Sequence, residues 1–272
     1  MAVQLGVPVP SPPLRIEDFP LGKLGGDPLW LLPEGPTECE GCENSLEFLL
    51  QLYCPLESEE TYHRYLYVLI CSVCQEVHVY RAQLPQGNSL YPEPDSDISD
   101  EQLLDLILPQ GPRPDLALSI VEEDADITEA ARILYALDLN DHLAVEDFAE
   151  RMPYTPHVRS SSPIEEEEED TDPPGDVAFE LLRLASTRQR RQCLRYNRQD
   201  VPLWYSNINR PDLTPQPCAC GSPRIFEFQV MPQAIHLAHL SCDFGSIYVF
   251  TCERSCNSTL YMREVSLVQD SL

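Results

Sequence analysis

The sequence predicts an α+β protein that is rich in β-structure, in which two related β units from an internal duplication pack as one body. An acidic, partly disordered insertion is expected between the two units. Three observations predict this fold: a pattern of cysteines and strands that occurs twice, short apolar and aromatic runs typical of strands, and an acidic, proline-rich middle. A chain of 272 residues suffices for one large or two small domains.

The chain divides into three predicted parts. Residues 1–84 form a β-rich half with four cysteines spaced for zinc, and residues 85–175 form the acidic insertion. Residues 176–272 form the second half, an amphipathic helix followed by a β domain. Within the first half, residues 1–38 are rich in proline and glycine and predict turns and loops, whereas the runs LEFLLQLY and YLYVLIC favour strands.

The middle part combines acidic stretches with one helical pattern. Residues 85–125 are acidic and proline-rich, which favours a solvated loop, although EQLLDLIL within them has the pattern of a short helix. Residues 126–152 predict a helix that begins with a capping box of Asp126 and Glu129. Residues 161–176 contain eight acidic residues and no base, so like-charge repulsion is expected to keep this linker extended.

The second half begins with VAFELLRLASTRQRRQCLRYN, residues 177–197. This stretch predicts an amphipathic helix with an arginine face, capped by Asp176. The stretch VPLWYS, residues 201–206, predicts the start of a strand, and a second set of cysteines follows in residues 218–256.

The two halves carry the same ordered set of motifs. Counted from Cys42 and Cys220, a phenylalanine follows after six residues and a glutamine after nine. The run LYVLIC, residues 66–71, matches IYVFTC, residues 247–252, and each half closes with another cysteine. Because each half is too small to bury much core alone, we expect the two halves to pack against each other and share one core.

Four cysteines of the first half have the spacing of a structural zinc site. Two pairs, each with two intervening residues, allow tight turns around one tetrahedral ion, and the residues between the pairs can form two strands that bring the turns together. The alternative is four packed thiols without metal. The predicted ligands are Cys39, Cys42, Cys71 and Cys74.

The second half contains a less regular set, in which one pair has one intervening residue and the other has three. The spacing leaves a second zinc site open, and its predicted ligands are Cys218, Cys220, Cys252 and Cys256. Cys54, Cys193 and Cys242 have no partner spacing and are expected in the core. His63 and His78 are alternative ligands, but single histidines near strands are usually packed.

The charge and composition narrow the class of protein. A net charge of −27 and a pI of about 4.3 repel nucleic-acid phosphates and favour basic partners, unless the acidity serves solubility alone. No apolar run is long enough to cross a bilayer and no secretory signal is evident, so we expect an intracellular protein without membrane contact. Eleven cysteines in a reducing compartment favour zinc ligands and core thiols over disulfides.

The sequence offers little for catalysis. It lacks the G-x-S-x-G elbow, the phosphate loop, the dinucleotide fingerprint and the H-E-x-x-H helix. A pair of Cys54 and His63 is conceivable as a nucleophile with its base, but a thiol in a hydrophobic strand is normally inert. We therefore expect that the protein is not an enzyme.

Several motifs together resemble the programmed cell death protein 2 family, which includes a "-like" paralogue and the yeast twenty-S rRNA accumulation protein. The motifs cover residues 21–84 and 176–256 and are LGGDPLW, FLLQLYCPLE, HRYLYVLIC, QCLRYN followed by PLWYS, CGSPRIFEFQVMP and DFGSIYVFTCERSC. The resemblance implies a duplicated β-rich fold and a dedicated chaperone. Such a chaperone captures one basic small-subunit ribosomal protein (eukaryotic protein two of the universal five family) during or after its synthesis and supports small-subunit biogenesis.

The chain departs from the family pattern in two ways. Some relatives carry an extra MYND-type zinc finger in the first half, for which this chain has no cysteine–histidine cluster, so a position nearer the "-like" branch is expected. Relatives also tend to have two residues between the cysteines where this chain has Cys218-x-Cys220. This departure bears on the second metal site and not on the family.

The expected partner is one basic ribosomal protein. The acidic tracts at residues 93–129 and 165–176 are candidate contact regions or solvated tethers, and no partner-binding residue is identified. We expect a monomer, no direct nucleic-acid contact, and a cytoplasmic location with entry into the nucleus left open. Two alternatives also stay open: a zinc-ribbon nucleic-acid-binding protein with a basic helix, and an acidic interaction scaffold.

Overall fold

The fold is described from a computed structural model of the chain. The structure describes residues 2–10, 22–33, 35–88, 116–152, 175–212, 214–240 and 242–271. Within these ranges the chain is rich in β-strands and has few helices, which confirms the predicted β-rich α+β class. No helix in the described ranges is long and apolar enough to cross a membrane.

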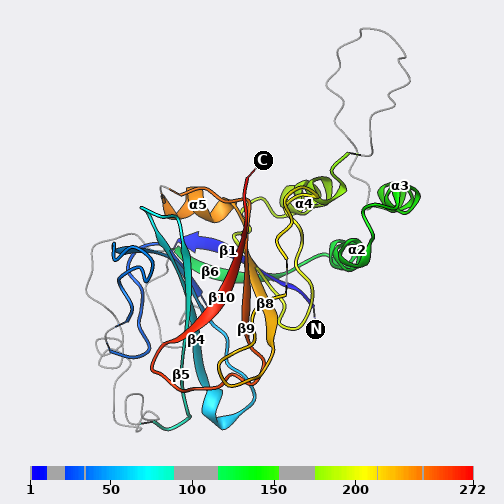
Figure 1. Cartoon of the computed structure of the whole chain (residues 1–272). Helices are drawn as coiled ribbons and strands as arrows, with labels where there is room; N and C mark the ends of the chain where they lie inside the picture. Colours follow the sequence, from blue (N-terminus) through cyan, green and yellow to red (C-terminus); the bar gives the residue numbers. More distant parts are fainter. Residues whose placement is uncertain are drawn as a thin grey trace.

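The described strands form one closed barrel (Figure 1). In the order in which neighbours pair, the strands are β1 (Gln4–Pro10), β6 (Leu116–Glu122), β2 (Gly22–Leu24), β3 (Leu46–Tyr53), β4 (His63–Cys71), β5 (Val77–Leu84), β10 (Met262–Gln269), β9 (Ser246–Cys252), β8 (Arg224–Val230) and β7 (Leu194–Tyr196). The barrel closes at β1, because this strand pairs with β6 and also with β7. Strands of the first and second halves therefore share one barrel.

Successive residues of a strand face opposite sides of the barrel wall, as the period of two requires. In β4, Leu66, Val68 and Ile70 belong to the core inside the barrel, whereas Tyr65 and Tyr67 belong to a separate cluster on the outer face. β9 alternates between the inner core and an outer cluster in the same way. Both faces of these strands are covered, which explains why the corresponding sequence runs are almost continuously apolar.

Helices cover the barrel on one side and at one end (Figure 1). The described helices are α2 (Ala125–Ala136), α3 (His142–Arg151), α4 (Val177–Arg188), α5 (Gln233–Ala238) and the short 3-10 turn η2 (Glu59–Thr61). The first three pack on the outer face of β8 and β9 through a cluster that includes Leu181, Trp204 and Phe250. Helix α5 places Ala234 in the core inside the barrel and so covers one of its ends.

The single helix predicted for residues 126–152 is two helices. The break lies between Ala136 and His142, where short polar side chains bind the nearby backbone. Asp141 caps α3, since its carboxylate accepts a hydrogen bond from Ala144 N over 3.2 Å. Such local bonds favour turns and caps over a helix interior.

The predicted capping box at the start of this segment is wrong. Helix α2 follows Asp124, which makes no side-chain capping bond. Asp126 instead forms an ion pair with Arg188 of α4 over 2.6 Å, so the start of α2 is fixed by a neighbouring helix. Asp176 caps α4 as predicted, because its carboxylate accepts a hydrogen bond from Phe179 N over 3.0 Å.

The second half differs from its prediction in two places. The helix predicted for residues 177–197 ends at Arg188, and its last part forms β7 instead. Cys193 N, just before β7, donates a hydrogen bond to Gly6 O of β1 over 2.9 Å, so pairing with a distant strand overrides the local helical pattern. Residues 201–206 are not a strand, because side chains bind their backbone as described below.

The sequence pattern does not predict β1, β2 or β6. The first two lie within residues 1–38 and the third within residues 85–125, where the composition favours loops. In the barrel, β6 pairs with β1 on one side and β2 on the other, so part of the middle segment belongs to the barrel wall. The predicted short helix at residues 101–108 and the acidic linker up to residue 174 lie outside the described residues.

Strands β3 and β8 carry a bulge at matching positions. The pairing register shifts between Phe48 and Leu50 in β3, and between Phe226 and Phe228 in β8. Phe48 and Phe226 are the residues that match when the cysteine motifs of the two halves are aligned. A bulge bends its strand and increases the local twist, so the barrel wall curves at equivalent points of the two halves.

Candidate functional site: two cysteine clusters and an acidic groove

The four predicted cysteines of the first half come together at one end of the β3–β4 pair. We call Cys39, Cys42, Cys71 and Cys74 the first cluster. The Sγ–Sγ distances are 3.5 Å for Cys39–Cys74, 3.4 Å for Cys42–Cys71 and 3.6 Å for Cys42–Cys74. Zinc–sulfur bonds of about 2.3 Å in a tetrahedron separate the sulfurs by about 3.8 Å, so a small expansion of this cluster admits one ion.

Each cysteine pair of the first cluster closes a turn that ends in a left-handed residue. Glu43 N donates a hydrogen bond to Cys39 O over 2.8 Å, and Gln75 N donates to Cys71 O over the same distance. The φ angles of Glu43 and Gln75 are 59° and 62°. This left-handed conformation favours glycine over residues with a Cβ atom. Glu43 and Gln75 therefore adopt it at a cost in free energy.

Polar neighbours contact the sulfurs of the first cluster. Asn44 Nδ2 donates a hydrogen bond to Cys42 Sγ over 3.3 Å, and His78 Nε2 lies 3.3 Å from Cys39 Sγ. The hydrogen bond from the Asn44 side chain is the main reason that the pKa of Cys42 is lowered to about 6. Contacts of this kind stabilise the thiolate, which is the form of cysteine that binds metals.

A mixed donor set overlaps the first cluster. Ligand atoms of Cys39, Glu76 and His78 all lie within 4.8 Å of one another. Cys39 belongs to both sets, so the two sets cannot hold separate ions independently. Four thiolates form the closed tetrahedral set of a structural zinc site, which makes His78 a hydrogen-bonding neighbour of the cluster in our interpretation.

The cysteines of the second half also come together, despite their irregular spacing. We call Cys218, Cys220, Cys252 and Cys256 the second cluster. The Sγ–Sγ distances are 3.4 Å for Cys218–Cys256 and 3.6 Å for Cys220–Cys252, and all four sulfurs lie within 4.8 Å of one another. The two altered spacings therefore do not prevent the four thiols from forming a common site.

The turns of the second cluster are one residue shorter than those of the first. Gly221 N donates a hydrogen bond to Cys218 O over 2.8 Å, and Ser255 N donates to Cys252 O over 2.9 Å. Gly221 and Ser255 both have positive φ angles, as Glu43 does in the first cluster. Gly221 follows Cys220, so the turn at the first pair has room for only one residue between its cysteines. Ser255 instead precedes Cys256, so the turn at the second pair has three residues between its cysteines.

Both clusters fit zinc on donor chemistry. Each presents four thiol sulfurs, the donor set of a closed structural site that leaves no position for a reactive water. The eight cysteines of the two clusters are the residues that would hold the ions. Bound zinc would contribute folding free energy at these positions.

The loop of the second cluster is bound by side chains of the first half. Arg64 Nε of β4 donates a hydrogen bond to Ser255 Oγ over 3.0 Å. Arg81 Nη2 of β5 donates to Cys256 O over 2.6 Å. The second cluster therefore lies where the two halves of the barrel meet. The conformation of its loop depends on the hydrogen bonds that it makes with the first half.

A buried ion-pair network joins the halves beside this cluster. Arg64 and Glu227, both 0% exposed, approach to 2.8 Å, and Arg198 contacts the other carboxylate oxygen of Glu227 over 3.1 Å. Burial is the largest single influence on Glu227 and would raise its pKa. The charge and hydrogen bonds of Arg64, together with Thr251 and Arg198, outweigh burial, and the pKa lies below its ordinary value. Removal of one partner from a buried ion pair strongly lowers the stability of the fold, because the other charge is left buried without compensation.

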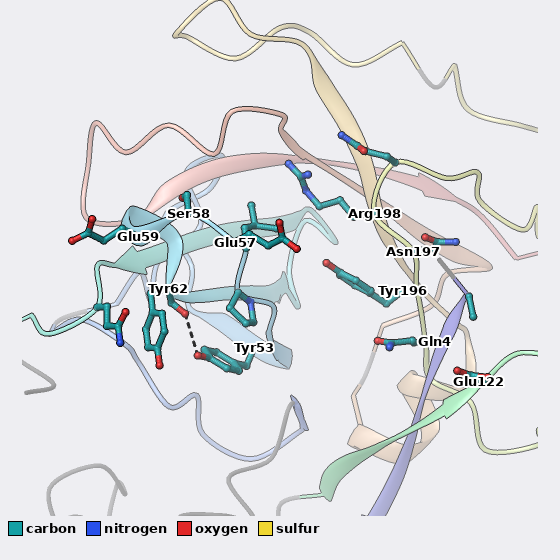
Figure 2. A pocket seen from close by; sticks show the side chains of 15 residues that line it. Gln4, Tyr53, Glu57, Ser58, Glu59, Tyr62, Glu122, Tyr196, Asn197 and Arg198 are labelled. Atoms are coloured by element: carbon teal, nitrogen blue, oxygen red, sulfur yellow. Dashed lines mark hydrogen bonds between the residues drawn. The ribbon is translucent and has the colours of Figure 1, made fainter. Parts of the chain in front are cut away.

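A groove of about 1430 Å³ opens beside this network (Figure 2). One wall is the connection between β3 and β4, with Tyr53, Glu57 and Tyr62. The opposite wall comes from β6 and β7, with Glu122 and Tyr196. We call this feature the acidic groove. Sequence reasoning does not find it, because its walls lie far apart along the chain.

The remaining cysteines lie in the core or against it. Cys54 and Cys193 are buried, and desolvation raises the pKa of each thiol to about 12, which makes them poor nucleophiles. Cys54 Sγ accepts a hydrogen bond from Arg64 Nη1 over 3.0 Å and donates one to Leu52 O over 3.7 Å, so the hydrogen bonds described for this thiol do not include His63. Cys242 is half-buried and packs against the core.

Most arginines of the predicted basic helix are neutralised, although the exposed Arg190 and Arg191 form none of the ion pairs found among the described residues. Arg183 forms an ion pair with Glu180 over 2.6 Å, and Arg188 pairs with Asp126 over 2.6 Å. These acidic partners occupy the cations that a phosphate backbone would need. The arginines of α4 therefore give little support to the nucleic-acid alternative.

The structure also contains a repeated contact that the sequence analysis missed. The tripeptide Pro-Leu-Trp occurs at residues 28–30 and again at residues 202–204. Leu29 N donates a hydrogen bond to Gln51 Oε1 over 2.7 Å. Leu203 N donates to Gln229 Oε1 over 2.9 Å, and Gln51 and Gln229 are themselves equivalent in the alignment of the two halves.

A second pair of contacts follows two residues further on in each segment. Leu31 N donates a hydrogen bond to Tyr67 OH over 2.8 Å, and Tyr205 N donates to Tyr248 OH over 3.1 Å. The signal was present in the sequence, since each Pro-Leu-Trp segment precedes the glutamine and tyrosine that bind it. Side chains, rather than a neighbouring strand, hold these two extended segments on the barrel wall.

The fold and the site define a class of protein: a closed barrel shared by two halves, each half carrying four clustered cysteines. Residues 2–97 match the family model described as Programmed cell death protein 2, N-terminal domain. Residues 176–270 match the model described as Programmed cell death protein 2, C-terminal putative domain. The chain belongs to the programmed cell death protein 2 family, as its sequence motifs suggest.

Curated relatives support this assignment along almost the whole chain. Programmed cell death protein 2 of Rattus norvegicus is 31% identical, and the alignment covers 99% of this chain and 97% of the relative. Programmed cell death protein 2-like of Homo sapiens is 26% identical over 97% of this chain and 94% of the relative. These two identities do not favour the expected position nearer the "-like" branch.

A further relative bears a name that refers to ribosomal RNA. Probable 20S rRNA accumulation protein 4 of Schizosaccharomyces pombe is 32% identical over 127 residues, which cover 41% of this chain and 32% of the relative. No solved structure matches the chain.

Proposed function

We propose that this protein is a dedicated, non-enzymatic chaperone that binds a basic small-subunit ribosomal protein and supports biogenesis of the small ribosomal subunit. The similarity to a fission yeast protein named for 20S rRNA accumulation carries the link to ribosome biogenesis. The client that we propose is the eukaryotic small-subunit protein two, of the universal five family. The protein acts in the cytoplasm, as a monomer, and its entry into the nucleus is a further part of the proposal.

The charge of the chain supports a basic client. A net charge of −27 attracts the lysine- and arginine-rich segments typical of ribosomal proteins and speeds their capture. The same charge repels RNA, so ribosomal RNA does not bind the chaperone. Ribosomal RNA instead competes with the chaperone for the basic segments of the client and displaces it when it binds them. The interaction is therefore expected to weaken as salt is added.

Zinc has a structural role in this proposal. One ion in each cluster would fix the turns between strands and, at the second cluster, the contact of the two halves. The chemistry of four thiolates provides no open coordination position for a substrate.

We also infer that the two halves arose by internal duplication. The matching bulges of β3 and β8 support this origin, as do the equivalent hydrogen bonds of Gln51 and Gln229. Four independent features at equivalent positions are difficult to obtain by chance: the cysteine motifs, the bulges, the Pro-Leu-Trp segments and the tyrosines that bind them.

Purification of the tagged protein from its own cells, with nuclease present, tests the proposed function. Mass spectrometry is expected to find one small-subunit ribosomal protein at near-equal stoichiometry, in a complex that weakens with salt. Whole ribosomal subunits, or many unrelated proteins at similar levels, would contradict a dedicated chaperone and favour the RNA-binding or scaffold alternative. A parallel purification without nuclease identifies proteins that are captured through RNA.

A further inference from the structure

The acidic groove carries negative charge on both of its walls. Glu57 and Glu59 lie on the wall formed by the β3–β4 connection, and Glu122 lies on the opposite wall at the end of β6 (Figure 2). All three side chains are exposed. The ion pairs found among the described residues leave these three carboxylates without a cationic partner.

Arg198 also lines the groove, and its guanidinium is bound from behind. Arg198 Nε contacts Glu227 Oε2 over 3.1 Å, and Arg198 Nη2 donates a hydrogen bond to Glu253 O over 2.8 Å. These contacts turn the guanidinium donors toward the protein. Glu227 is shared with Arg64, so Arg198 keeps part of its positive charge, but the three glutamates outnumber it among the described residues that line the groove.

Aromatic rings lie between the carboxylates. Tyr53 and Tyr62 are joined by a hydrogen bond from Tyr53 OH to Tyr62 O over 3.1 Å. Tyr196 faces them from the opposite wall, and its hydroxyl donates to Glu227 Oε1 over 3.0 Å, which fixes the ring (Figure 2). Aromatic faces beside carboxylates suit the long side chains of arginine and lysine, whose stems pack on rings while their charged ends reach the acids.

The size and position of the groove favour a peptide over a small molecule. A volume of about 1430 Å³ exceeds the range of roughly 300–1,000 Å³ that is typical of small-molecule sites. Tyr53, Glu57 and Tyr62 belong to the first segment that matches a family model, and Tyr196 belongs to the second, whereas Glu122 lies between the two segments. An occupant would therefore contact both halves of the chain at once. A nucleic acid is disfavoured, because its phosphates would face three carboxylates.

We propose that the acidic groove binds an extended segment of the client that is rich in arginine or lysine. This inference rests on the proposed function, since it assigns the surface by which a basic ribosomal protein is held. Charge complementarity supplies the recognition, and the two walls orient the segment between the halves of the barrel.

The test uses the full chain and two synthetic probes. The first probe is an unstructured peptide of alternating arginine and serine, and the second has citrulline in place of arginine. Fluorescence anisotropy measures binding to the unchanged protein, to the E57Q/E122Q variant and to an E146Q/E150Q control. The control removes the same charge from exposed positions of α3, away from the groove. Thermal unfolding verifies that all three proteins are equally folded.

The arginine peptide is expected to bind the unchanged protein and the control equally, and to bind E57Q/E122Q about tenfold more weakly, because one carboxylate is lost from each wall. The citrulline peptide is expected to bind none of them measurably. Equal loss in the control, or no loss in E57Q/E122Q, overturns the inference, because the attraction would then come from overall charge or from another surface.

A separate measurement with the purified ribosomal protein distinguishes failure of the inference from failure of the proposed function. If the ribosomal protein binds the unchanged chain and E57Q/E122Q equally, the chaperone function stands and the groove is the wrong surface. If it binds neither protein while the arginine peptide still depends on Glu57 and Glu122, the groove binds basic segments and the proposed client is wrong.

Discussion

Gln51 and Gln229 bind equivalent backbone atoms in the two halves of the barrel, each accepting a hydrogen bond from the leucine of a Pro-Leu-Trp segment. The two glutamines lie in β3 and β8, one residue past the end of matching bulges. A buried glutamine that takes the place of a strand partner fixes where each extended segment lies. The two segments are therefore positioned by the same chemistry on opposite parts of the barrel.

The tyrosines beside these glutamines test the same arrangement. Tyr67→Phe removes the hydroxyl that accepts from Leu31 N and is expected to lower the free energy of unfolding by about 1–3 kcal/mol. Tyr248→Phe is expected to cost less, about 0.5–1.5 kcal/mol, because Gln269 Oε1 also accepts from Tyr205 N over 3.2 Å. Chemical denaturation followed by tryptophan fluorescence measures the change. Tyr135→Phe, at an exposed position of α2, is the matched control and should leave stability unchanged. Unchanged midpoints for both test variants would show that the hydroxyl contacts contribute nothing.

Metal content should follow the two clusters independently. Cys39→Ser and Cys218→Ser are each expected to remove one equivalent of zinc, measured by mass spectrometry of the metal, and to lower stability by several kcal/mol. Cys242→Ser changes a cysteine outside both clusters and is expected to retain all the metal. Full metal content after either cluster substitution would remove that cluster as a zinc site.

The left-handed turn of the first cluster predicts a stabilising substitution. Glu43→Gly relieves the strain of a positive φ and is expected to raise the free energy of unfolding by about 0.5–1 kcal/mol, after the cost of greater freedom in the unfolded chain. Glu43→Ala is the control, because it removes the same side chain but keeps the Cβ atom. Equal stability of the glycine and alanine variants would mean that the backbone is unstrained at this position.

The buried pair of Arg64 and Glu227 predicts a strongly non-additive double substitution. Glu227→Gln leaves the arginine charge buried without its carboxylate and is expected to cost about 3–5 kcal/mol. The double variant Arg64→Met with Glu227→Leu removes both charges and should be more stable than Glu227→Gln. Urea unfolding of Arg64→Met, of Glu227→Leu and of the double variant measures the coupling, and simple addition of the two single effects would argue against a tight pair.

The same carboxylate predicts part of the acid sensitivity of the fold. The pKa of Glu227 is lower in the folded protein than in the unfolded chain, where it is about 4.3, so its contribution is present above that value. The contribution is lost as the pH falls through the folded pKa, because the unfolded state then binds the proton more readily. Stability measured between pH 7 and pH 3 should therefore fall less steeply for Glu227→Gln than for the unchanged protein. Identical slopes would contradict this assignment.

The cysteine clusters could be predicted from the sequence because their information is local. Each cysteine pair closes its own turn, and β3 with β4 joins the turns of the first cluster, as the spacing requires. The spacing of the cysteines alone was not sufficient to predict the second cluster. Its irregular pairs are accommodated by the shorter turns at Gly221 and Ser255, and a positive φ at a serine leaves no mark in the sequence.

The elements that escaped prediction depend on distant partners. Strands β1, β2 and β6 lie in stretches whose composition favours loops, and they become strands because the barrel has open edges to pair with. The acidic groove could not be predicted for a related reason. Tyr53 and Tyr196 face each other only after the barrel closes, and no pattern along the chain relates their positions.

Strand β10 has a consequence for shortened chains. Residues Met262–Glu264 pair with β5 and residues Val265–Gln269 pair with β9, so one strand covers an edge from each half. A product of premature termination before Met262 would leave both edges uncovered, and uncovered edges are templates for aggregation. Such a product would expose two unpaired strand edges in the cell. It would be prone to aggregation, which is the outcome that the intact protein is proposed to prevent for its client.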